Sequence, residues 1–136
     1  MENENVKKLK EAYAFWNENL GSNNQLWMDL MDDNVTFRSL AGGAPGMEFT
    51  LDCRGKKDVE RYFGGLAADW ETLHYTPEEF IAQGDRVVVL SRCGWRNRKT
   101  GRTVESPKAD FFRFSNGKVV DVFEFYDTHR CIAAGL

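Results

Sequence analysis

The sequence predicts a single α+β domain, in which helices pack on a curved, mostly antiparallel sheet. Up to Trp70, apolar residues recur at spacings of three and four, and after Trp70 the period changes to two. Dipeptides typical of hairpin turns separate the period-two segments: Gly84-Asp85, Thr100-Gly101 and Asn116-Gly117. Helices followed by hairpin-linked strands favour an α+β fold over a parallel one. The 136 residues suit one core, so one domain is expected over residues 1–136.

Three helices are expected before the long strands. The first, residues 6–20, carries one apolar stripe and is followed by a glycine. Ser22 and Gln25 form the pattern of a capping box, which predicts the start of a second helix with its buried side over residues 26–31. The third helix, residues 59–70, is again apolar at helical spacing.

The remaining elements are strands, one long connection and a last short helix. Residues 35–40 form a short strand, and the glycine-rich segment 41–55 that follows is long enough to be a candidate lid. The four long strands are expected at residues 73–83, 86–97, 102–115 and 118–126, and a short helix capped by Asp127 starts at about Thr128.

Composition and charge exclude several classes of function. The net charge of −3 argues against nucleic acid or an anionic membrane as the partner, because both bind basic surfaces. The apolar runs are too short to span a bilayer. The three cysteines, Cys53, Cys93 and Cys131, are widely spaced and follow no Cys/His ligand pattern. Neither a disulfide framework nor a metal site is therefore expected, and the expected location is the cytoplasm.

The last strand is apolar on both of its faces. Three helices can cover one face of such a sheet, and the other face would expose a large apolar patch, which monomers seldom tolerate. The residues expected there are Val88, Leu90, Phe111, Phe123 and Phe125. The sequence therefore predicts a homodimer formed through the outer face of the sheet.

Three segments, 30–37, 84–89 and above all 108–127, resemble the nuclear transport factor 2-like superfamily, which includes ketosteroid isomerases and SnoaL-like polyketide cyclases. The resemblance covers nearly the whole chain. It implies a cone-shaped, cystatin-like fold with a pocket for a small apolar ligand, and no cofactor. Because this fold hosts enzymes, binding modules and adaptors alike, it does not by itself imply an activity.

The resemblance also implies site residues. Tyr13 and Asp110 match the isomerase pair that binds the substrate oxygen. The position of the isomerase base is Arg38, and arginine cannot abstract a proton, which argues against steroid isomerisation. Glu124 matches the acid/base of the cyclases, whereas their histidine position is again Asp110.

Strand alternation predicts that these carboxylates meet. With a three-residue loop at 115–117, Lys108 opposes Glu124 and Asp110 opposes Val122, which places all three ionisable groups on the helix-facing side. A two-residue Asn-Gly turn would shift the pairing by one residue and separate the groups.

Two interpretations of this cluster stay open. In the first, Glu124 is a general acid/base, Asp110 and Tyr13 bind a substrate oxygen, and Arg38 binds a carboxylate or enolate oxygen. In the second, Glu124 is one half of a structural ion pair with Lys108 or Arg38. The other expected pocket residues are Trp16, Trp27, His74, Cys93, Trp95, Phe112 and Tyr126.

The leading functional prediction is a SnoaL-like pocket protein that acts as a cofactor-independent isomerase, cyclase or hydratase on an apolar carbonyl compound. The main alternative is a non-catalytic module that binds a hydrophobic metabolite. A third class is a protein-interaction adaptor that uses the outer sheet face.

Overall fold

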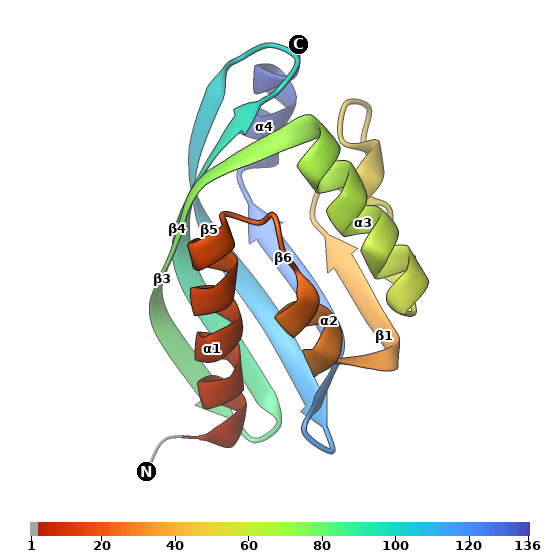
Figure 1. Ribbon diagram of the computed structural model, residues 1–136, viewed down its shortest axis with the longest axis vertical. Helices are drawn as coiled ribbons and strands as arrows, with labels where there is room; N and C mark the ends of the chain where they lie inside the picture. The colour runs from red at the N-terminus through yellow and green to blue at the C-terminus, as the bar shows by residue number, and fades with distance from the viewer. Residues whose placement is uncertain (1–2) are drawn as a thin grey trace.

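The fold, described here from a computed structural model, covers residues 3–136 (Figure 1); the first two residues of the predicted domain lie outside the described part. Its centre is a curved, six-stranded sheet in the order β2-β1-β6-β5-β4-β3. Figure 1 shows α1, α2 and α3 on one face of this sheet. The α+β prediction is therefore confirmed.

The helices begin and end for local reasons. In α1 (Glu4–Asn19), the Asn3 side chain accepts hydrogen bonds from two backbone N–H groups of the first turn, and Leu20 ends the helix in a left-handed conformation. The short α2 (Gln25–Leu30) has no side-chain cap, so the predicted capping box is wrong. The next helix, α3 (Lys56–Asp69), follows a glycine.

Five of the six strands agree closely with the predicted segments, two of them with earlier starts, whereas the two-residue β2 lies in a segment that was expected to be a connection. β1 spans Met31–Ser39, β2 Cys53–Arg54, β3 Trp70–Gln83, β4 Arg86–Asn97, β5 Thr103–Ser115 and β6 Lys118–Tyr126. Within the described chain, every neighbouring pair is antiparallel except β1 and β6. Helix α4 (Thr128–Ala134) closes the chain, and the Asp127 side chain accepts a hydrogen bond from Arg130 N, as a cap does.

The segment 41–55 packs against the rest of the fold. It contains the 3₁₀ turn η1 (Glu48–Thr50) and the two residues of β2. Met47 and Phe49 are buried, and the Phe49 ring lies 5.3 Å from the ring of Tyr62 on α3. This packing brings the segment to the edge of the space between α3 and the sheet.

The hairpin between β5 and β6 corrects the predicted register. Asn116 and Gly117 both have positive φ, and Ser115 pairs with Lys118, so the turn has two residues and not three. A bulge follows, because Val119 and Asp121 pair with adjacent residues of β5 and leave one extra residue between them. The two-residue turn alone would put the predicted inward residues of β6 on the outer face. The extra residue of the bulge returns them to the face that points toward the helices.

As a result, Asp110 pairs directly with Glu124, and Lys108 pairs with Tyr126. The predicted partners differ by two residues, but the predicted face is the same. On β5 the residues that point toward the helices are buried.

No helix within residues 3–136 is both long enough and apolar enough to cross a membrane.

Candidate functional site

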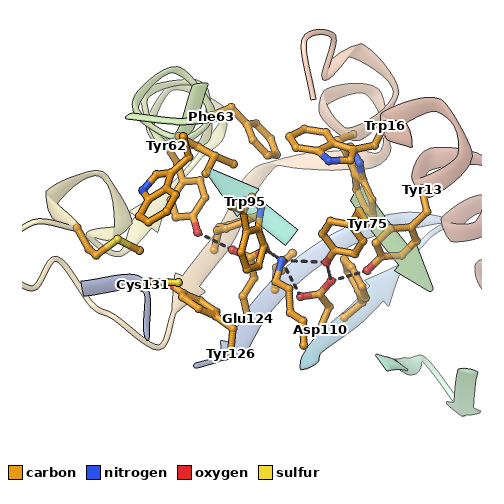
Figure 2. A pocket seen from close by; sticks show the side chains of 18 residues that line it. Tyr13, Trp16, Tyr62, Phe63, Tyr75, Trp95, Asp110, Glu124, Tyr126 and Cys131 are labelled. Carbon is orange, nitrogen blue, oxygen red and sulfur yellow. Dashed lines mark hydrogen bonds and ion pairs between the residues drawn. The ribbon is translucent and has the colours of Figure 1, made fainter. Parts of the chain in front are cut away.

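A hollow of about 80 Å³ lies between the helices and the inner face of the sheet, and its walls are mostly aromatic (Figure 2). All four tryptophans and all four tyrosines of the chain line it. Interlocking rings hold the walls in place; the Trp27 ring, for example, stacks on Phe112 at 5.7 Å, and Tyr13 meets the edge of Trp27 at 4.9 Å. Such walls favour a flat, apolar ligand.

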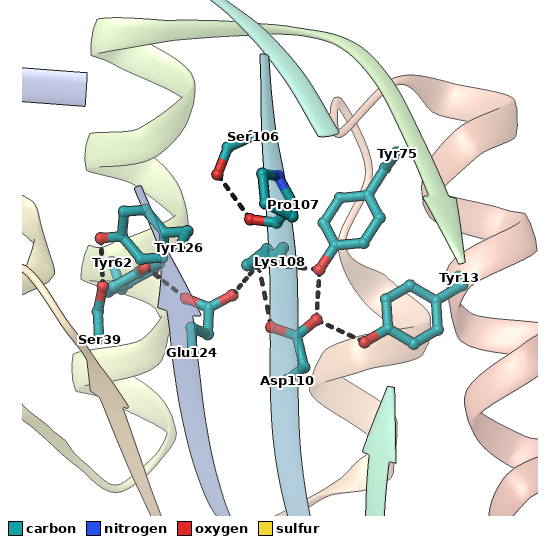
Figure 3. Close-up of polar contacts among 10 residues, drawn as sticks. All are labelled: Tyr13, Ser39, Tyr62, Tyr75, Ser106, Pro107, Lys108, Asp110, Glu124 and Tyr126. Carbon is teal, nitrogen blue, oxygen red and sulfur yellow. Dashed lines mark hydrogen bonds and ion pairs between the residues drawn. The ribbon is translucent and has the colours of Figure 1, made fainter. Parts of the chain in front are cut away.

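Three ionisable groups form the floor of the hollow (Figure 3). Lys108 Nζ lies 2.5 Å from Glu124 Oε2 and 3.3 Å from Asp110 Oδ1. The three meet because alternate residues of β5 point inward and the bulged register puts Asp110 opposite Glu124. All three side chains are at most 13% exposed, so one ammonium is shared by two carboxylates that are largely shielded from bulk water.

Tyrosine hydroxyls supply the remaining contacts of Asp110. Tyr13 donates to Asp110 Oδ2 at 2.6 Å, and Tyr75 donates a short hydrogen bond to the same oxygen. Lys108 Nζ in turn donates to the Tyr75 oxygen at 2.9 Å. The Asp110 carboxylate is therefore held from α1, β3 and its own strand.

Glu124 is bound on both of its oxygens. Tyr62 of α3 donates to Oε1 at 2.6 Å, and Lys108 donates to Oε2. Beside it, the hydroxyls of Tyr126 and Ser39 lie 2.5 Å apart. The cluster thus ties α1, α3, β1, β3, β5 and β6 together at one point.

Burial and charge set the protonation of these groups. Burial raises the pKa of Glu124, and the opposing attraction of Lys108 does not cancel this effect. Burial lowers the pKa of Lys108, but the neighbouring carboxylates outweigh it and raise that pKa well above its usual value, so the ammonium stays charged. Burial also raises the pKa of Tyr13, Tyr62 and Tyr75, whose hydroxyls therefore remain donors.

Three buried polar atoms of the lining have no hydrogen-bond partner among the described residues: Asp110 Oδ1, Trp16 Nε1 and Trp70 Nε1. Asp110 Oδ1 contacts Lys108 only as the 3.3 Å ion pair. Nearly all buried polar groups in proteins are satisfied, so these three atoms are exceptions within the described chain.

Most of the predicted site residues line the hollow: Tyr13, Trp16, Trp27, Trp95, Lys108, Asp110, Phe112, Glu124 and Tyr126. Cys93 is buried in the core but is not part of the lining, and burial raises its pKa to about 12. Cys131 of α4 lines the hollow in its place.

Besides Cys93, two further predicted site residues, Arg38 and His74, lie outside the pocket. Arg38 points to the outer face, because the inward positions of β1 near it are Phe37 and Ser39. Its guanidinium lies 3.6 Å from Asp121 and 4.7 Å from the Phe123 ring. The prediction that Arg38 binds a substrate oxygen in the pocket is therefore wrong. Lys108 is the cation that the hollow contains.

The expectation that His74 faces the pocket is also corrected. A register shift in β3 between Thr72 and His74 changes the alternation, so that Thr72 and Tyr75 are the buried residues. His74 is 41% exposed in its side chain, and its Nε2 lies 2.7 Å from Glu105 Oε2.

Sequence reasoning missed Tyr62, Trp70 and Tyr75 as residues of the site. Tyr62 and Trp70 belong to the apolar pattern of the third helix, and Tyr75 lies just after the bulge that obscured the parity of its strand. The available signal was the hydroxyl itself, because a buried tyrosine usually needs a polar partner.

Metal binding has no geometric support in the described part of the chain. No group of three or more His, Cys, Asp or Glu side chains in residues 3–136 is placed to hold a metal ion. The three cysteines are free and buried.

Comparisons with known proteins agree with this architecture. The SnoaL-like domain model matches residues 9–122. No curated protein matches the sequence. A nuclear transport factor 2-like protein of unknown function from Burkholderia pseudomallei is similar in structure, with a TM-score of 0.82 and 22% identity over 98% of each chain.

Two further solved structures carry functional names. A proposed SnoaL-like polyketide cyclase from Jannaschia sp. CCS1 has a TM-score of 0.76 and 17% identity, over 96% of this chain and 90% of that one. TerC, co-crystallised with polyporic acid, has a TM-score of 0.78 and 19% identity, over 96% and 99%. At these identities the likeness shows the nuclear transport factor 2-like fold alone. Because the family model spans most of the sequence, this chain belongs to the SnoaL-like domain family.

Proposed function

We propose that this chain binds a small apolar carbonyl compound in the hollow and moves a proton on it without a cofactor, in an isomerisation, cyclisation or hydration. The observation that carries the proposal is the floor of the hollow. There, Glu124, a buried carboxyl with a raised pKa, lies 2.5 Å from a charged ammonium inside aromatic walls. A carboxyl whose pKa is raised toward neutral pH can both accept and donate a proton.

In the proposed reaction, Glu124 in its ionised form takes a proton from the carbon next to the substrate carbonyl. The electron pair of the broken C–H bond forms a C=C bond, and the carbonyl oxygen becomes an enolate oxygen. Lys108 stabilises that negative charge, because its ammonium stays protonated and is shielded from water. Glu124 then returns the proton to another carbon of the conjugated system, which completes an isomerisation and regenerates the carboxylate.

The structural neighbours support the class of ligand. One of them is named as a polyketide cyclase, and another was crystallised with polyporic acid. A carbonyl-bearing, ring-shaped ligand also fits an aromatic hollow with a few polar groups at its floor.

Proton transfer is tested by deuterium exchange. The wild-type chain is incubated in D₂O with single-ring enones and lactones, and incorporation at the carbon next to the carbonyl is followed by NMR. We expect exchange in the wild type and a loss of about 100-fold or more in Glu124→Gln, which is the usual contribution of a positioned acid/base. Arg38→Gln, on the outer face, is the matched control and should exchange as fast as the wild type. Equal rates in Glu124→Gln and the wild type would contradict the proposal.

A non-catalytic binding module is the second candidate, and one observation favours it. Both Glu124 oxygens are already hydrogen-bonded, to Tyr62 and Lys108, as in a satisfied structural ion pair. This function predicts saturable binding of the same compounds with no exchange above the rate in buffer. The exchange experiment therefore separates the two functions.

A further inference from the structure

The hollow has a floor of charged groups and, facing it, a side of aromatic rings. Lys108, Asp110 and Glu124 form the floor. Figure 2 shows Trp16 and Phe63 on the side opposite to it, and both side chains line the hollow. A ligand whose carbonyl oxygen lies at the floor therefore points the rest of its skeleton toward these two rings.

The two rings join two helices. The Trp16 ring of α1 lies 5.6 Å from the Phe63 ring of α3, the only ring contact between these helices among the described residues. Trp16 is 7% exposed and is held from behind, because a Cβ added at Gly21 would come within 2.8 Å of its ring. Phe63 is half-buried and also lies 6.0 Å from the Phe37 ring of β1. The pair thus closes the hollow between α1 and α3.

The other rings that the helices contribute to the lining are fixed by further interactions. Tyr13 and Tyr62 donate to carboxylates of the floor, and Trp27 stacks on Phe112. Removing any of these rings breaks a buried hydrogen bond or a ring stack, which costs stability. Phe63 makes ring contacts alone, so its removal enlarges the hollow and leaves the floor intact.

The size of the hollow sets a limit on its ligand. Its volume of about 80 Å³ is smaller than the ~150 Å³ cavity that holds benzene in an engineered protein. One six-membered ring therefore fills the hollow and extends toward its opening, and a second, fused ring would collide with the rings opposite the floor. The side chain of Phe63 is itself one such ring, so its loss makes room for one more ring of the ligand.

We propose that the Trp16–Phe63 pair determines specificity by size, so that the hollow binds single-ring carbonyl compounds and rejects fused two-ring ones. This inference deepens the proposed function and rests on it in one respect, namely that a carbonyl compound binds in the hollow with its oxygen at the floor. It holds equally for a substrate that turns over and for a ligand that is only bound.

The test compares the dissociation constants of two enones, measured by NMR titration. Cyclohexenone has one ring, and octalone carries the same enone in a fused two-ring skeleton. The wild type should bind cyclohexenone about 10-fold more tightly than octalone or better. In Phe63→Ala, the affinity for octalone should rise by about 10-fold or more, because its second ring becomes buried. The affinity for cyclohexenone should not rise, since its ring already fits.

Phe80→Ala is the matched control for the loss of a phenyl ring. The Phe80 ring lies 6.0 Å from the Tyr13 ring but is not part of the lining. This variant should therefore leave the ratio of the two dissociation constants unchanged. Trp16→Phe makes the other member of the pair smaller, and it should shift the ratio toward octalone by a smaller factor than Phe63→Ala does.

A measurement on the wild type covers the case that a variant fails to fold. The CH₂ groups of bound cyclohexenone that are farthest from its carbonyl should give nuclear Overhauser effects to ring protons of Trp16 and Phe63. Contacts of these groups with other walls only, equal wild-type affinity for the two enones, or an unchanged ratio in folded Phe63→Ala overturns the inference.

The outcomes separate this inference from the proposed function. Deuterium exchange that depends on Glu124, combined with an unchanged ratio in Phe63→Ala, contradicts the size limit alone. A changed ratio without exchange contradicts only the proton transfer. If neither enone binds the wild type or Phe63→Ala, both proposals are wrong, because the hollow is then not a site for carbonyl compounds.

Discussion

At the scale of single residues, Lys108 holds the site together. Its side chain is 7% exposed, and its ammonium compensates two carboxylates that otherwise repel each other in an aromatic hollow. A buried pair contributes little net stability, but removing one partner leaves uncompensated charge, which is costly.

We therefore predict that Lys108→Met lowers the free energy of unfolding by about 3–5 kcal/mol, measured by urea denaturation at pH 7. Lys118→Met is the matched control on the same hairpin, because that side chain is exposed and donates only to the backbone oxygen of Asp29. It should cost less than about 1 kcal/mol. Adding Asp110→Asn and Glu124→Gln to Lys108→Met should restore part of the loss. Comparable losses in the two lysine variants would contradict the central role of Lys108.

The raised pKa of Glu124 predicts a pH dependence of stability. Above the ordinary value of 4.5, the unfolded chain has released this proton while the folded protein still holds it. The free energy of unfolding contributed by this group therefore falls as pH rises from 4.5 through the folded pKa. The unfavourable contribution is absent below 4.5 and complete above the folded pKa.

The experiment compares the wild type with Glu124→Gln by urea denaturation between pH 4.5 and 8. Stability of the wild type relative to the variant should decrease steadily with rising pH, because glutamine does not titrate. The opposite result is a difference in free energy of unfolding between the two proteins that stays constant or grows in favour of the wild type with rising pH. Either outcome would show that the fold favours the charged form of Glu124.

The sequence predicted the meeting of Asp110, Lys108 and Glu124 because strand alternation and the family resemblance point to the same face. Family position alone misplaces Arg38, because the alternation of β1 turns it outward while Phe37 and Ser39 point inward. Tyr62 and Tyr75 were not identified, since a buried tyrosine and a buried phenylalanine have the same place in an apolar pattern.

At the scale of secondary structure, the β5–β6 hairpin shows the limit of register prediction. Asn116-Gly117 is a strong signal for a two-residue turn, and the structure contains it. That turn alone would have put Asp110 and Glu124 on opposite faces, and the bulge beside Val120 prevents this. A bulge has no comparable residue signature, so the register depends on packing that one strand's sequence does not contain.

Helix α3 contains two adjacent glycines with different surroundings. A Cβ at Gly64 would meet no atom within 4 Å, whereas a Cβ at Gly65 would come within 2.3 Å of Phe49 Cβ. Phe49 belongs to η1 and packs on Tyr62, which binds Glu124. The close approach at Gly65 thus links the segment 41–55 to the site.

We predict that Gly64→Ala raises the free energy of unfolding by about 0.5–1 kcal/mol, because alanine favours the helix. Gly65→Ala gains the same propensity but must displace Phe49, so we expect a net loss of about 1–3 kcal/mol. Denaturation of the two variants side by side measures this. Equal stabilisation by both would mean that η1 does not pack on α3 as described.

At the scale of the whole molecule, no helix of residues 3–136 covers the outer face of the sheet. Figure 1 places α1, α2 and α3 on the other face. The outer face presents Val88, Leu90, Phe111 and Phe123 half-buried and Phe125 exposed, and the last two rings stack at 4.4 Å. The excess of apolar strand over helix was visible in the sequence, which is why this face could be expected before the structure.

The last prediction is that this face joins two copies of the chain. Its apolar surface is continuous across β4, β5 and β6, and such a patch is more stable when covered by a second copy than when left in water. Light scattering at micromolar concentration should give about twice the chain mass of 15.6 kDa. Phe125→Glu should give the monomer mass and still bind ligand, because alternate residues put Phe125 outside and Glu124 inside. Leu26→Glu, at an exposed leucine of α2 on the opposite side, should remain dimeric. A wild type that stays monomeric would mean that the outer face is tolerated in water or is covered by a different protein.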